Sequence, residues 1–192
     1  MKRVFVGGSR RISQLPDSVC DRACKMIQSG LQILVGDANG ADKALQEYFA
    51  LHGYQNVLVY CTGLECRNNL GDWEIRRIDC RLKSRGFQYY AAKDLAMSKE
   101  AHYGFMLWDG HSIGTLNNVL NLLERRKQAV VYFAPEERFV TLARLDEVEN
   151  LLARCETDAV GRFEQRLNLR ERLTFSEKQI SFPFGPSMGR NA

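Results

Sequence analysis

The amino-acid sequence predicts an α/β protein with a Rossmann-like, mainly parallel sheet between two layers of helices. Short apolar runs that suit buried strands alternate with segments whose apolar residues recur at helical spacing. The connections between them are short, and a strand–helix–strand order of this kind gives right-handed crossovers and parallel strands. Glycines follow the first two apolar runs, at Gly7 and Gly36, as expected where a strand turns into a helix. Together these observations predict a three-layer αβα fold.

The first half of the chain carries the clearest pattern, with three strands separated by two helices. Val19, Ala23 and Ile27 share one face of the first predicted helix, and Gly30 suits the point where that helix ends. A second amphipathic stretch ends before Gly53. The predicted strands cover residues 3–6, 31–35 and 57–60, and the predicted helices cover residues 16–28 and 41–49.

The pattern weakens over residues 61–86. A polar loop over residues 61–73 comes first, and we predict a helix over residues 74–83 and a strand over residues 87–90 after it. Apolar periodicity then returns. The remaining predicted elements are a short helix over residues 91–100, a strand over residues 103–108, a helix striped by Leu116, Val119, Leu120 and Leu123, and a strand over residues 129–133.

A change of pattern at Pro135 divides the chain into a Rossmann-like domain over residues 1–135 and a helical extension over residues 136–192. The extension begins with a predicted edge strand over residues 139–142, and its tail from Ser176 is predicted to be irregular. Its two helical stripes contain Leu145, Val148, Leu152, Phe163 and Leu167. An apolar stripe in water needs a partner, so we expect this segment to form a homo-oligomer. The alternative is that its helices fold back over the core sheet.

Composition excludes several classes of protein. The 192 residues are 45% hydrophobic, too many for a disordered chain, and no apolar run approaches the roughly 18 residues of a membrane helix. The start, MKRVFVGG, is not a signal peptide, so we expect a cytoplasmic protein. A net charge of +4 without a concentrated basic face suits a small anionic ligand and argues against nucleic acid. The six cysteines lack zinc-module spacing, and we expect neither a metal nor another cofactor.

Three glycine-rich turns follow predicted strands, over residues 7–10, 36–42 and 109–115. In a parallel sheet, ligands bind beyond the carboxyl ends of the strands, near the point where the strand order switches. Glycine lets backbone N–H groups approach a ligand closely, and the N-terminus of the following helix carries partial positive charge. The three turns together predict a site for a phosphate or a ribose. Each turn alone also fits an ordinary strand-to-helix connection.

The polar side chains of these turns suit such a ligand. Arg10 can supply a bidentate guanidinium to a phosphate. The hydroxyl donors are Ser9, Ser112 and Thr115, and the carboxylates that can accept from ribose hydroxyls are Asp37, Asp42 and Asp109. The loop after the third strand adds Arg67, Asn68 and Trp73 as candidate contacts. Trp73 either stacks on a base or anchors this loop in the core.

Three motifs occur in order along the chain: VFVGGSR, LVGDANGADKAL and LWDGHSIGTLNNVLNLL. As a set they resemble the SLOG superfamily of Rossmann-like nucleotide-binding domains, which includes the Lonely-guy phosphoribohydrolases and the Smf/DprA proteins. The resemblance covers about residues 2–134 and implies a site for a nucleotide or nucleotide-derived ligand. The implied contacts are Gly7, Ser9, Arg10, Gly36, Asp37, Gly40, Asp42, Ser112, Gly114 and Thr115. Our predicted site adds Gly8, Arg67, Asp109 and Asn118.

Asn118 departs from the pattern of the enzymes in this superfamily. The phosphoribohydrolases and the related deoxyribosyltransferases place a catalytic Glu three residues after the threonine of the G-T pair, where this chain has Asn118. An amide cannot act as the nucleophile or general base of N-glycosidic cleavage. The candidate replacement carboxylates are Asp109 and Glu74, with Asp72 beside Glu74.

The missing Glu favours a protein that senses or sequesters a nucleotide-derived small molecule. One alternative is a hydrolase or transferase that acts on the N-glycosidic bond of a nucleoside phosphate with a displaced carboxylate. A second alternative is single-stranded DNA binding, which the resemblance to the Smf/DprA proteins allows. That function calls for a basic groove with interleaved aromatic residues, a pattern that the sequence does not display.

Overall fold

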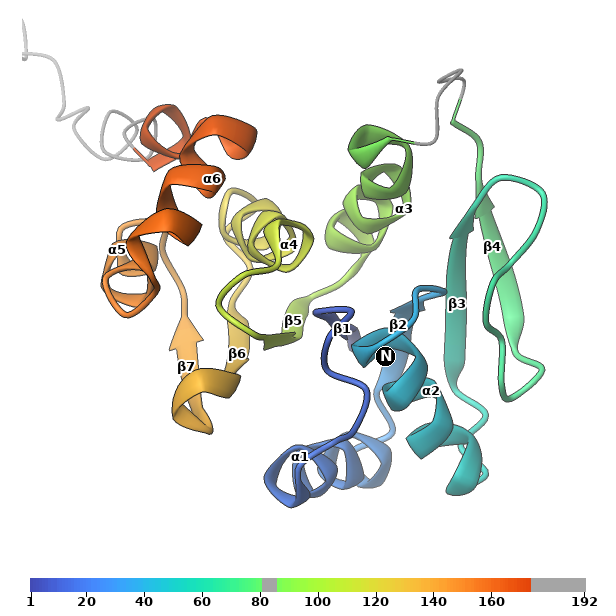
Figure 1. Cartoon of the computed structure of the whole chain (residues 1–192). Coiled ribbons are helices and arrows are strands. Elements are labelled where there is room, and N and C mark those ends of the chain that lie inside the picture. The colour runs from blue at the N-terminus through green and yellow to red at the C-terminus, as the bar shows by residue number, and fades with distance from the viewer. Residues whose placement is uncertain (81–85, 174–192) are drawn as a thin grey trace, which may run out of the picture.

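The computed structural model describes residues 1–80 and 86–173, which form a seven-stranded sheet with helices on both faces (Figure 1). The strand order is β4-β3-β2-β1-β5-β6-β7, and neighbouring strands are parallel except for the antiparallel pair β6–β7. The strands are β1 (Arg3–Gly8), β2 (Gln32–Gly36), β3 (Val57–Thr62), β4 (Glu74–Ile78), β5 (Tyr103–Trp108), β6 (Ala129–Phe133) and β7 (Arg138–Leu142). This architecture confirms the predicted α/β fold and its mainly parallel sheet.

The helices divide between the two faces of the sheet. Helices α1 and α2 cover one face, and the remaining α-helices of the described residues lie on the other (Figure 1). They are α1 (Asp17–Gln28), α2 (Ala41–Leu51), α3 (Phe87–Glu100), α4 (Ile113–Leu123), α5 (Glu147–Leu152) and α6 (Thr157–Leu167), and a short 3-10 helix spans Ala134–Glu136.

Strand β1 explains why the inner strands are apolar on both sides. Val4 and Val6 pack in the core beneath α1 and α2, whereas Phe5 packs in the core beneath α3 and α4. All three side chains are at most 1% exposed. A strand that is covered on both faces needs a continuous apolar run rather than an alternating one.

Two predicted elements are wrong in the segment where the sequence pattern is weak. Residues 74–78, predicted to be helical, form the edge strand β4, which pairs only with β3 among the described strands. Three of its five residues are charged and its two isoleucines are three positions apart, so this strand shows no apolar alternation. Residues 87–90, predicted to be a strand, are the first turn of α3. Their aromatic residues favour strands locally. The buried face of α3 includes Lys93 and Ser98, so its apolar stripe is weak and does not reveal the helix.

The segment after Pro135 belongs to the same hydrophobic core as the sheet. Residues 138–142 confirm the predicted edge strand, and α5 and α6 confirm the two helical stripes. The stripe residues are at most 8% exposed and join the core beneath α4, where Phe163 meets Trp108 at a ring-centroid distance of 5.8 Å. The helices therefore fold back over the core, and the stripe that led us to expect a homo-oligomer is covered within the chain.

The part of the extension beyond Leu173 lies outside the described residues, as do residues 81–83 of the helix predicted over residues 74–83. Among the residues that the structure describes, no helix is both long and apolar enough to cross a membrane.

Candidate functional site

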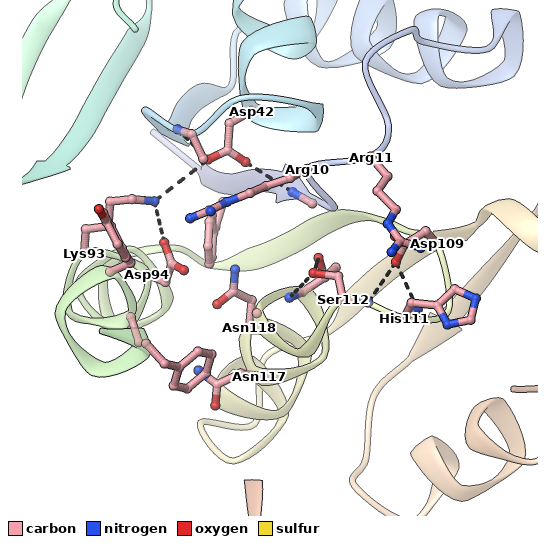
Figure 2. A pocket seen from close by; sticks show the side chains of 18 of the residues that line it. Arg10, Arg11, Asp42, Lys93, Asp94, Asp109, His111, Ser112, Asn117 and Asn118 are labelled. Carbon is pink, nitrogen blue, oxygen red and sulfur yellow. Dashed lines mark hydrogen bonds and ion pairs between the residues drawn. The ribbon is translucent and has the colours of Figure 1, made fainter. Parts of the chain in front are cut away.

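A cavity of about 680 Å³ opens at the carboxyl ends of β1 and β5 (Figure 2). From β1 the chain builds outward through β2, β3 and β4, then returns to the other side of β1 with β5. The cavity therefore lies at the switch point of the strand order, where parallel α/β sheets bind ligands. Its wall combines residues from the loop after β1, the start of α2, α3, the start of α4, and α6.

The turn between β5 and α4 is held by its own polar groups. Asp109 Oδ1 accepts hydrogen bonds from Ser9 Oγ at 2.9 Å, from His111 N at 3.0 Å and from Ser112 N at 2.8 Å. Ser112 is the N-cap of α4, and its Oγ accepts from the backbone N–H and the hydroxyl of Thr115. Asp109 and these hydroxyls thus shape the turn and the start of α4.

Gly114 leaves the first turn of α4 open toward the cavity. A Cβ built on Gly114 would have Ser112 Oγ, 4.0 Å away, as its nearest neighbour. The backbone N–H of Gly114 lies in the first turn of α4, where N–H groups lack intrahelical acceptors and carry partial positive charge. Space, free donors and positive potential coincide at this point, as an anion requires.

Asn118 brings an unsatisfied polar atom to the same wall. Its side chain is 6% exposed and lines the cavity one turn after Gly114. Its Oδ1 is buried without a hydrogen-bond partner; the only other buried side-chain atom in this state among residues 1–80 and 86–173 is Thr62 Oγ1. Leaving a buried polar group unpaired costs about 1–3 kcal/mol. A ligand group that pairs with Asn118 removes this cost.

The opposite wall is a buried cluster of charges around Lys93 of α3 (Figure 2). Lys93 Nζ lies 2.7 Å from Asp94 Oδ1, 3.8 Å from Asp42 Oδ2 and 4.0 Å from Asp37 Oδ1. Asp37 is also paired with the guanidinium of Arg67, whose Nε donates to Asp37 Oδ2 at 2.9 Å. The sequence places these residues far apart, and the parallel sheet brings them to one edge.

Protonation in this cluster depends on burial and on pairing. Burial raises the pKa of Asp42 to about 6, although the charge of Lys93 and hydrogen bonds from Gly8 N and Ala38 N act in the opposite direction. Burial also disfavours ionisation of Asp37, but Arg67 and Lys93 hold its pKa below the usual range. Asp42 is therefore the carboxyl group of this wall whose charge changes near neutral pH.

The glycines of the first two turns serve the packing of the protein on itself. A Cβ on Gly36 would lie 2.3 Å from Asp42 Oδ2 and 2.4 Å from Lys93 Nζ, and a Cβ on Gly7 would lie 2.8 Å from Asp42 Oδ1. A Cβ on Gly40, where φ is +79°, would lie 2.3 Å from the carbonyl oxygen of Arg10. Gly8 is equally close to Leu107. These positions exclude a side chain, whether or not a ligand binds.

Nine of the predicted site residues line the cavity: Gly8, Arg10, Asp42, Arg67, Asp109, Ser112, Gly114, Thr115 and Asn118. Gly7, Ser9, Gly36, Asp37 and Gly40 are not part of its wall; they contact wall residues from behind. No group of three or more His, Cys, Asp or Glu side chains in the described ranges is arranged to hold a metal ion.

The structure removes three other candidates from the site. Glu74 begins β4 opposite Leu58 at the start of β3, and therefore sits at the amino edge of the sheet, away from the cavity. Trp73 is 6% exposed in the core beneath α2, with its indole N–H donated to Tyr54 O at 2.8 Å. Trp73 thus anchors the loop, the second of its two predicted roles. Asn68 likewise holds this loop, because its side chain donates to Asp37 O and Asn39 Oδ1.

Several wall residues were not predicted: Arg11, Tyr90, Lys93, Asp94, Asn117 and Arg162. Arg11 adjoins Arg10 and was within reach of the sequence argument. Tyr90 was missed because we predicted a strand over residues 87–90. Lys93 lies in a helix that was predicted, but the local sequence does not show that its side chain is buried. Arg162 lies in α6, where no local pattern indicates that the helix reaches the sheet edge.

Comparison with known proteins adds no assignment to this geometry: no protein-family model matches the chain, and no curated protein matches it significantly.

Proposed function

We propose that this protein binds a nucleotide or nucleotide-derived ligand in the cavity at the switch point, as a sensing or sequestering protein of the SLOG type. The unpaired, buried Oδ1 of Asn118 beside the open first turn of α4 is the observation that carries the proposal. It supports a ligand with an anionic group and, close to it, a hydrogen-bond donor. A nucleotide has both, in its phosphate and in its ribose hydroxyls or base.

In this proposal the phosphate sits at the start of α4. The Gly114 N–H and the positive end of the helix stabilise the negative charge. The guanidinium of Arg10, which lies 5.6 Å from the ring centre of Tyr90, approaches from the loop after β1 (Figure 2). Asn118 Oδ1 accepts from a ribose hydroxyl or an exocyclic amine. The deeper wall, with Asp42 and Lys93, closes the sheet side of the site.

Binding rather than catalysis is favoured by the state of the candidate carboxylates. Asp109 Oδ1 already accepts three hydrogen bonds, from Ser9 Oγ, His111 N and Ser112 N, which fix its position. Glu74 lies at the other edge of the sheet. Asn118 occupies the position of the enzymes' Glu and cannot exchange a proton at neutral pH.

One observation favours the N-glycosidic hydrolase or transferase as a second candidate. Asp42 lines the cavity, and burial raises its pKa to about 6, which suits a general acid or base. Asp42 replaces Asp109 and Glu74 as the carboxyl group to test. Nothing comparable favours single-stranded DNA, because the basic residues of the wall surround one cavity of about 680 Å³, whereas a strand needs a basic groove that follows several nucleotides.

Replacing Gly114 by Ala tests the binding site. The methyl group would project into the cavity without meeting protein atoms, so the fold is retained while the phosphate position is filled. Gly161→Ala in α6 is the matched control, since its Cβ also meets nothing within 4 Å. Calorimetric titration with the adenosine, guanosine, cytidine and uridine 5′-monophosphates should show binding for the wild type and Gly161→Ala. Gly114→Ala should bind at least tenfold more weakly, and unchanged affinity would contradict the site.

Both alanine variants should keep or slightly raise thermal stability, by up to about 1 kcal/mol, because Ala is the better helix former. Loss of binding by Gly114→Ala with retained stability therefore reports on the cavity alone.

Chromatographic detection of free base separates binding from turnover. The wild-type protein, incubated with each monophosphate, should release no base beyond the buffer control. Base release that disappears in Asp42→Asn while nucleotide binding persists would replace the binding proposal with the hydrolase candidate.

A further inference from the structure

The positive charges of the cavity wall fall into two groups. Lys93 and Arg67 lie within 4.0 Å of carboxylates of the protein itself. Arg10, Arg11 and Arg162 line the same cavity, yet no carboxylate of residues 1–80 or 86–173 lies within ion-pair distance of them.

These three arginines come from two separate parts of the wall, and the guanidinium of Arg10 reaches the ring of Tyr90 in α3. Arg10 and Arg11 come from the loop after β1, and both line the cavity together with Asp109 and His111 of the turn before α4 (Figure 2). Arg162 comes from α6, whose neighbouring residue Phe163 is fully buried against Trp108. His111 Nε2 lies 3.9 Å from Glu156 Oε1, directly before α6, so this helix starts next to the same turn.

The charge around the cavity exceeds what a single phosphate group balances. A phosphate monoester carries a charge of about −2 at neutral pH. Three guanidinium groups and the N-terminus of α4, equivalent to roughly half a positive charge, face it. Asp42 and Asp94 of the wall are paired with Lys93, and Asp109 subtracts one charge from this total, which still leaves more than two positive charges. The volume of about 680 Å³ is also within the range of pockets that enclose ligands of nucleotide size.

We infer that the ligand carries two linked phosphoryl groups, as a nucleoside diphosphate or a pyrophosphate ester does. The inference rests on the proposed function and specifies its ligand. The first phosphoryl group lies at Gly114 and Arg10, where Asn118 contacts the adjoining part of the ligand. The second lies between Arg11 and Arg162. Residues 136–173 are then part of the binding site as well as of the core, because α6 supplies Arg162.

Paired titrations with the mono- and diphosphate of the same nucleoside test this inference. The wild-type protein should bind each diphosphate at least tenfold more tightly than the matching monophosphate. Inorganic pyrophosphate should displace a bound nucleotide at lower concentration than inorganic phosphate does, which makes the result independent of the base.

Arg162→Gln should reduce diphosphate affinity about tenfold and change monophosphate affinity less than twofold. Arg166→Gln is the matched control: it removes the same charge from an exposed position one turn further along α6, and it should change neither affinity. Arg11→Gln should give the same result as Arg162→Gln. Because Arg11 lies outside α6, this second variant tests the inference even where Arg162→Gln disturbs that helix.

The outcomes separate this inference from the proposed function. Equal wild-type affinity for mono- and diphosphates, or an equal loss for both ligands in Arg162→Gln, overturns the second phosphoryl site and leaves nucleotide binding intact. Binding of no nucleotide in the panel overturns the proposed function and this inference together.

Discussion

Two glycine-rich turns at the same edge of the sheet differ in what occupies the space beside them. The turn between β2 and α2 is filled by the protein, since the side chains of Asp42 and Lys93 fill the space where a Cβ of Gly36 would lie. The turn between β5 and α4 leaves the Cβ position of Gly114 open toward the cavity. Both turns have the sequence signature of a phosphate cradle. A glycine therefore indicates close approach, but only the structure tells whether the approaching group is a ligand or another part of the chain.

The same comparison extends to charge. Beside the first turn, Lys93 and three carboxylates form a buried cluster with Arg67. Around the cavity that the second turn lines, Arg10, Arg11 and Arg162 have no carboxylate of the described residues within ion-pair distance, and Asn118 has an unpaired oxygen. Charged groups that pair with one another within the protein are typical of a structural element. Charged and polar groups that lack a protein partner around a cavity are typical of a binding surface.

Removing the central charge of the first turn should have the largest effect. Lys93→Met would leave Asp42 and Asp94 buried without their cation, which we expect to lower the free energy of unfolding by about 3–5 kcal/mol. Lys43→Met is the control, because Lys43 pairs with Glu47 on the exposed face of α2 and should contribute less than about 1 kcal/mol. Urea denaturation measures both. Similar small losses would mean that the buried cluster contributes little to stability.

Filling the two turns in parallel sharpens the comparison. Gly36→Ala forces a methyl group into Asp42 and Lys93 and should cost about 1–3 kcal/mol of stability, the range for overpacked sites. Gly114→Ala should cost none and should impair ligand binding instead. Thermal denaturation and titration of the two variants side by side should give opposite results. Equal destabilisation would show that the second turn is packed as tightly as the first.

The sequence predicted this fold because most elements carry strong local signals. The continuous apolar run of Phe5 with its valine neighbours indicates a buried strand, and the helical spacing of Leu116, Val119 and Leu120 indicates a buried helix face. Strand β4 was missed because it is an edge strand in which charged residues interrupt the apolar pattern, and pairing with β3 decides its conformation. Local periodicity carries no information about such a partner.

The candidate site was predicted only where its residues belong to turns next to strands. Arg10, Ser112 and Gly114 could be found because carboxyl ends of parallel strands meet at one edge. Lys93 and Arg162 could not, because a basic residue on a helix usually faces solvent, and only tertiary packing turns these two toward the cavity. The roles of Gly36 and Gly40 also depend on neighbours distant in sequence.

The pH dependence of stability should show the smallest effect and should come from the first turn. Asp42 has a pKa of about 6 in the folded protein, above the value near 3.8 expected when it is unfolded. Between about pH 4 and 6 the folded state therefore holds a proton that the unfolded state has lost, so the contribution of Asp42 to stability falls as the pH rises through this window. Asp37 has a lowered pKa and acts in the opposite sense, with a contribution that is lost only as the pH falls below about 4.

Asp42→Asn isolates this contribution. Urea denaturation from pH 4.5 to 6.5 measures the unfolding free energy of the wild type and of the variant. As the pH rises, the wild type should lose stability relative to the variant, by no more than about 1.4 kcal/mol per pH unit. The amide oxygen of Asn can accept from only one of the two backbone N–H groups that bond to Asp42, Gly8 N and Ala38 N. The loss of the other bond does not depend on pH, so the slope of the difference still reports the titration of Asp42. Asn118→Asp, at the second turn, serves as the comparison because its carboxylate would face unmatched arginines. If the difference in unfolding free energy between the wild type and Asp42→Asn does not change with pH, Asp42 is not the carboxyl group that titrates in this range.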